Sequence, residues 1–153
     1  MHSNIYVLAP NVELDEEYFQ AHIGDYFTER SDSEKHDEVA WLCKAYNCFS
    51  YKNGELLFNW KKGEKIIKQA LEQVKQLLDD FLNPTVDCGY VNPPKTDTRY
   101  DFLLRMISDT IKPRGFYVAF DGYPTDLMTY IASQVSNKQN VSLKVYKVYD
   151  YHF

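Results

Sequence analysis

The chain has 153 residues, of which 44% are hydrophobic and 25% are charged. This balance excludes wholesale disorder, and the length suffices for a real core, so we expect one domain over residues 1–153. The net charge is −5, no apolar run approaches the ~20 residues of a membrane span, and no basic segment followed by an apolar one begins the chain. We therefore expect a soluble, cytoplasmic protein.

The negative charge is concentrated in the first 40 residues. They hold ten acidic side chains against only Arg30 and Lys35, a net charge of −8, whereas the remaining 12 acidic and 15 basic residues give +3. Such a region repels nucleic acid and attracts a basic protein surface. The distribution predicts a protein partner with a basic surface, and no direct contact with nucleic acid or membrane.

The N-terminal third predicts one strand and two helices. Residues 4–9 form a short β-prone run that ends at Pro10. Aromatic and aliphatic residues then recur at helical spacing from Asp15 to about Glu29, which predicts an amphipathic helix. After polar capping residues at 31–33, a second helix ends near Asn47, with Trp41 beside its apolar face and partly exposed.

The middle of the chain carries the clearest local signals. Asn53-Gly54 is the preferred pair for a two-residue type I′ turn, and the apolar residues on both sides predict a β-hairpin over 48–60. A long helix is predicted from about Glu64 to Leu82. We interpret its broad apolar stripe as a core face and the lysines opposite as a solvated face.

The C-terminal half predicts two further helices and two strands. One helix covers Arg99 to about Ile111, after an irregular stretch at 85–98. A buried strand at 116–120, expected at the centre of the sheet, stops at a turn and leads into a helix near Thr125. Residues 141–153 read as one long β segment whose alternation changes phase at Tyr146, which suggests a bulge or burial on both faces.

These elements together indicate the α+β class. We expect one antiparallel or mixed sheet of about five strands, including the Asn53-Gly54 hairpin, with about five helices packed mostly on one face.

Catalytic motifs give little support for an enzyme. Phosphate-binding glycine loops and a G-x-S-x-G elbow are absent, and the four histidines are scattered. Cys43, Cys48 and Cys88 have no metal-ligand spacing, so we expect reduced thiols, no metal and no cofactor.

The turn after residue 120 is the best candidate for a ligand site. Asp121, Tyr123 and Asp126 follow a strand end, and two carboxylates there could hold a divalent cation or act as acid and base. The competing interpretation, which we favour, is structural: Asp121-Gly122 makes the turn and Asp126 caps a helix. A small enzyme or nucleotide-binding domain is therefore the alternative function.

The leading hypothesis is a non-enzymatic protein that binds a macromolecular partner through its acidic N-terminal region. Inhibitors of nucleic-acid enzymes that mobile elements carry are similar in size and acidity, and this likeness implies a counter-defence or nucleic-acid-mimic role. An acidic face that only confers solubility is the competing reading. The predicted partner-binding residues are acidic or aromatic: Glu13, Glu16, Glu17, Tyr18, Tyr26, Glu34 and Trp41.

Overall fold

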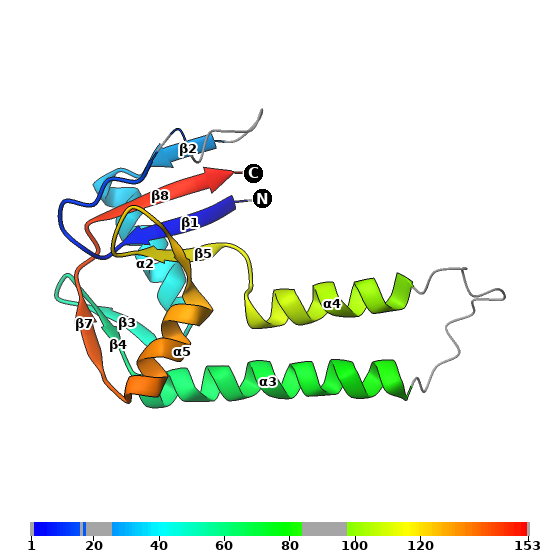
Figure 1. Cartoon of the computed structure of the whole chain (residues 1–153). Coiled ribbons are helices and arrows are strands. Elements are labelled where there is room, and N and C mark those ends of the chain that lie inside the picture. Colours follow the sequence, from blue (N-terminus) through cyan, green and yellow to red (C-terminus); the bar gives the residue numbers. More distant parts are fainter. Residues whose placement is uncertain (1, 16, 18–25, 84–97, 153) are drawn as a thin grey trace.

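The computed structural model describes residues 2–15, 17, 26–83 and 98–152. In this part of the chain four helices accompany two β-sheets, which confirms the α+β class (Figure 1). The strands are β1 (His2–Val7), β2 (Tyr26–Glu29), β3 (Phe49–Lys52), β4 (Glu55–Phe58), β5 (Phe116–Ala119), β6 (Thr125–Asp126), β7 (Val141–Leu143) and β8 (Lys147–His152). The helices are α2 (Asp32–Ala45), α3 (Trp60–Leu82), α4 (Thr98–Ile111) and α5 (Leu127–Asn137).

The strands are divided between two sheets, where the sequence predicted one. The larger sheet has the order β2-β8-β1-β5-β6, and the smaller has the order β3-β4-β7. In the larger sheet β1 pairs in parallel with β5 and antiparallel with β8, so this sheet is mixed. The prediction that the strand at 116–120 is central is wrong, because β1 occupies the centre and β5 lies beside it.

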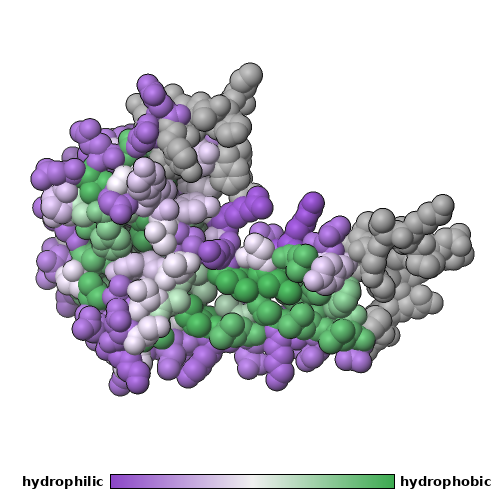
Figure 2. Space-filling view, viewed as in Figure 1, coloured by the Kyte–Doolittle hydropathy of each residue, from purple (hydrophilic) through white to green (hydrophobic). Residues whose placement is uncertain are grey.

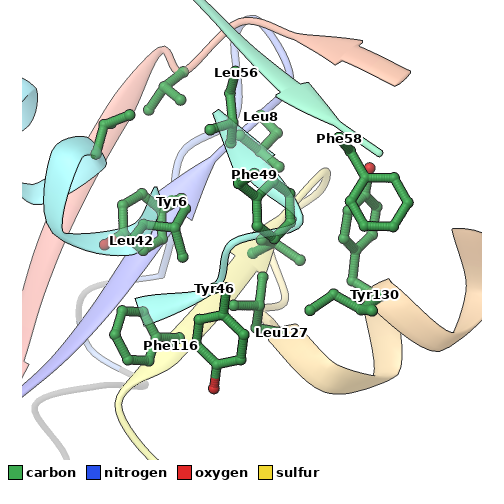
Figure 3. Close-up of a cluster of buried hydrophobic side chains, with 14 of the residues drawn as sticks. Tyr6, Leu8, Leu42, Tyr46, Phe49, Leu56, Phe58, Phe116, Leu127 and Tyr130 are labelled. Atoms are coloured by element: carbon green, nitrogen blue, oxygen red, sulfur yellow. The ribbon is translucent and has the colours of Figure 1, made fainter. Parts of the chain in front are cut away.

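The two faces of the larger sheet bury different clusters, because successive side chains of β1 point to opposite faces. Tyr6 and Leu8 join a large core that lies against the smaller sheet, α2 and α5 (Figure 3). Ile5 and Val7 join a smaller cluster on the other face, which Leu14 helps to cover. The helices α2 and α5 therefore share one face of the larger sheet.

The C-terminal segment belongs to both sheets. β7 pairs with β4 in the smaller sheet and β8 pairs with β1 and β2 in the larger one. The prediction of one continuous β segment is therefore wrong, and the change of phase at Tyr146 marks the crossing between sheets. There the backbone N–H of Tyr146 donates a hydrogen bond of 2.9 Å to the carbonyl oxygen of Val7.

The helix predicted to reach Glu29 is wrong over its last four residues. Residues 26–29 form β2, which pairs antiparallel with β8 at the edge of the larger sheet. Phe27 is buried there, and its ring stacks on Tyr149 with the centroids 4.6 Å apart. A cross-strand aromatic pair stabilises a sheet and outweighs the helical spacing of the aromatic residues. The rest of this predicted helix lies largely outside the described residues.

Local signals elsewhere are confirmed. Asn53 and Gly54 have φ values of 54° and 79° and join β3 to β4, as a type I′ turn requires. α2 begins with a capping box between Ser31 and Glu34, which satisfies backbone N–H groups at the helix start. α3, in contrast, begins at Trp60, four residues before the predicted start near Glu64, because the side chain of Asn59 caps it by accepting a 3.0 Å hydrogen bond from the N–H of Lys62.

Helices α3 and α4 form an antiparallel hairpin that projects away from both sheets (Figure 1). Only the first turns of α3 contact the body, where Gly63 is its single buried residue. A Cβ atom at Gly63 would lie 2.8 Å from Cζ of Phe58 and 3.1 Å from Cγ2 of Val135. The missing side chain therefore lets α3 approach β4 and α5 closely.

We predict that Gly63→Ala lowers the free energy of unfolding. Alanine favours the helix by about 1 kcal/mol, but crowding in a packed core costs about 1–3 kcal/mol, and the ring of Phe58 is held by the core around it. Chemical denaturation measures the difference. Phe58→Leu removes the ring atoms that the new Cβ would meet. Adding Gly63→Ala to the Phe58→Leu variant should therefore lower the free energy of unfolding less than adding it to wild type. A stabilised Gly63→Ala variant would contradict this packing.

Candidate functional site

The projecting hairpin exposes an apolar face, which is the most unusual surface of the described chain. Six side chains from the two helices are at least 40% exposed and lie on the same side of it. Spacings of seven and four residues place three on one side of α3, and spacings of four and seven place three on one side of α4. We call this set the hairpin face: Leu71, Leu78, Leu82, Tyr100, Leu104 and Ile111.

The two halves of the hairpin face are contiguous. Leu71 and Ile111 line the same apolar pocket of about 160 Å³, together with Met128 of α5. Figure 2 shows apolar surface running along the hairpin outward from this region. Phe102 and Met106 are exposed on the other side of α4, because they lie about half a turn away from Tyr100 and Leu104.

The sequence did not predict that this face is exposed. The apolar stripe of α3 was interpreted as core, yet two of its members are exposed, Leu71 at 58% and Leu78 at 40%. Periodicity reports that one side of a helix is apolar but not what covers it. The width of the stripe was the one signal in the sequence, because a single antiparallel helix covers a narrower part of its neighbour than a bundle does.

Charge along α3 is polarised. From residue 60 to residue 70 there are four lysines and one glutamate, a net charge of +3, and from residue 71 to residue 82 one lysine opposes three acidic residues, giving −2. Lys61 and Asp79 are both exposed and project from the same side of the helix, next to the hairpin face. The helix is therefore basic near the body and acidic toward its outer end.

A second candidate surface lies on α2. Glu34, Asp37, Glu38 and Trp41 occupy one side of this helix at spacings of three and four residues. Trp41 is 48% exposed, as predicted, and its ring packs on Phe116 at 4.6 Å. The structure thus brings together two of the predicted partner-binding residues, Glu34 and Trp41.

Arg30 holds this acidic surface together. Its guanidinium lies 2.9 Å from the buried carboxylate of Asp150 and 3.6 Å from the carboxylates of Glu34 and Glu38. The side chain and the backbone N–H of Ser31 donate hydrogen bonds to Glu34 and lower the pKa of its carboxyl. Glu34 is therefore ionised at neutral pH. Arg30 is the cation that the carboxylates of Glu34, Glu38 and Asp150 share.

The other predicted partner-binding residues are not on this surface. Glu13 and Glu17 are exposed, and the segment that contains Glu13 packs through Leu14 on the face of the larger sheet opposite α2. Tyr26 begins β2, whereas Glu16 and Tyr18 lie outside the described residues. The larger sheet thus separates the segment of Glu13 from the acidic surface of α2.

The carboxylates after β5 make structural contacts. Asp121 accepts a 2.9 Å hydrogen bond from the N–H of Tyr123 and so closes the turn. Asp126 caps α5 by accepting hydrogen bonds from the backbone N–H and the hydroxyl of Thr129, at 2.9 and 2.6 Å. Lys112 adds an ion pair to Asp126 at 3.5 Å, while Tyr123 is exposed. These contacts favour the structural interpretation of the turn.

The metal-binding side chains and the cysteines are the remaining candidates for chemistry. No group of three or more metal-binding side chains converges within them. Cys43 and Cys48 are free thiols, and burial raises the pKa of Cys48 to about 12, which keeps this thiol neutral and unreactive at physiological pH. Cys88 lies outside the described residues.

None of the described helices combines the length and the hydropathy that a membrane span needs.

Comparison of the chain with known proteins identified no relative. No family model matches the chain, and neither the curated proteins nor the solved structures gave a match.

We predict that Asp126→Ala destabilises the protein by about 1 kcal/mol, because α5 loses its N-cap. Asp126→Asn retains an oxygen acceptor for the N–H of Thr129 and should cost less. Urea denaturation of the two variants gives the comparison. Equal stability of wild type and Asp126→Ala would mean that the carboxylate is not structural, and would revive the ligand-site hypothesis.

Proposed function

We propose that this protein acts by binding another protein chain and that the hairpin face is its main binding surface. The observation that carries the proposal is the exposure of six large apolar side chains along a projecting helical hairpin. Contiguous apolar surface of this kind is unfavourable in water and marks interaction sites. Binding requires no catalytic group, in keeping with the structural roles of Asp121 and Asp126.

The shape of the hairpin suits this role. The surface combines leucine, isoleucine and tyrosine side chains, and large apolar and aromatic residues form the centres of protein interfaces. Charged residues flank it on α3, which gives the polar rim that such interfaces have. A rigid pair of helices also presents these side chains at little further cost in conformational entropy.

Photo-crosslinking in the native host tests this proposal. A photoreactive phenylalanine analogue in place of Leu78 should form an adduct with a protein chain. The matched control replaces Gln69, which is exposed on the opposite side of the same helix, and should form far less adduct. Equal adducts at the two positions, or adducts with lipid alone, would contradict a protein-binding role.

The acidic surface of α2 is a second candidate binding site, for a partner with a basic surface. It is favoured by the exposed carboxylates of Glu34 and Asp37 beside the half-exposed ring of Trp41. Aromatic rings surrounded by charge serve as anchors in interfaces. A mobile-element inhibitor or nucleic-acid mimic is the concrete form of this proposal, since its target would carry a basic surface.

Charge reversal distinguishes the α2 surface from bulk acidity. We expect Glu34→Lys with Asp37→Lys to abolish capture of a basic partner from the host. Glu13→Lys with Glu17→Lys makes the same change in net charge outside the α2 surface and should leave capture intact. Equal loss in both variants would assign the effect to overall charge rather than to a site.

A further inference from the structure

We infer that the chain that covers the hairpin face is a second copy of this protein, packed antiparallel about a two-fold axis near the middle of α3. This inference rests on the proposed function and names the partner. Two hairpins joined in this way make a four-helix arrangement that buries the hairpin faces of both copies.

The size of the face matches what such a dimer needs. The exposed parts of its six side chains amount to on the order of 600 Å² on one copy, close to the roughly 800 Å² per partner of a standard interface. The half-buried Val74 lies between Leu71 and Leu78, the half-buried Ile67 lies one turn before Leu71, and both add to this area.

Charge complementarity sets the antiparallel direction. The half of α3 near the body has a net charge of +3 and the outer half has −2. In a two-fold antiparallel pair the basic half of one copy lies along the acidic half of the other, whereas a parallel pair would oppose like charges. Leu71 is the midpoint of α3, which spans Trp60–Leu82, so a crossing there brings Lys61 of one copy near Asp79 of the other.

The antiparallel direction also occupies the root of the hairpin. The outer ends, with the 70% exposed Leu82, carry apolar side chains that have no cover from the body. At the root, the apolar pocket lined by Ile67, Leu71 and Met128 is open. In an antiparallel pair that crosses at Leu71, the middle of α3 of the other copy (residues 71–75) lies over this pocket, and Leu82 lies along the first turn of the other α3, so both regions are removed from water.

Analytical ultracentrifugation of the full chain over a concentration series is the test. The wild type should reach the mass of two chains, and Leu71→Glu with Leu78→Glu should raise the dissociation constant by at least about tenfold, because two charges enter an apolar interface. Phe102→Glu is the matched control, since this residue is 65% exposed on the other side of α4 and should leave dimerisation unchanged. Far-UV circular dichroism verifies that each variant is folded.

A charge swap tests the direction. Lys61→Asp alone and Asp79→Lys alone should each weaken the dimer about fivefold, because the pair occurs twice across the two-fold axis. The double variant restores complementarity between copies and should recover the wild-type dissociation constant. No recovery would overturn the antiparallel arrangement, and a wild type that stays one chain at every concentration would overturn the dimer. In the latter case a protein adduct at position 78 would still uphold the proposed function, with a different partner.

Discussion

The close approach of Gly63 to Phe58 and Val135 determines where α3 leaves the body of the protein. The same root is held by the Asn59 cap and by the side chain of Asn140, which accepts a 3.1 Å hydrogen bond from the N–H of Trp60. Because these contacts all lie in the first turns, they fix the direction of the helix but cover little of its apolar stripe. The remaining turns depend on α4 and on whatever packs against the hairpin face.

This arrangement couples stability to assembly. A helix buries an apolar stripe only when neighbours surround it, and two antiparallel helices leave one side of each open to water. Among the residues of α4, Leu103 is buried between the helices, whereas Leu104 and Ile111 remain exposed. In the proposed dimer, covering the hairpin face therefore stabilises the outer turns and forms the interface in the same step.

The features that depend on local backbone preferences could be predicted from the sequence. Those that depend on pairing between strands distant in the chain could not. The Asn53-Gly54 turn and the limits of α4 follow from backbone preferences and apolar period, and both are confirmed. The two sheets were not predictable, because alternation in residues 141–153 does not reveal which strand pairs with which. The candidate site shows the same limit. Trp41 was recognised as partly exposed beside an apolar face, but the exposure of Leu71 and Leu78 depends on which elements pack against α3, and helical periodicity does not encode that.

The proposed dimer covers the hairpin face of each copy with that of the other. Hydrogen–deuterium exchange of the purified chain, measured at several concentrations, tests it directly through the backbone amides of residues 72–82. If a second copy covers the face, protection of this outer half of α3 rises with concentration, while the amides of β1 in the sheet centre remain equally protected throughout. Protection that is the same at every concentration would contradict the dimer.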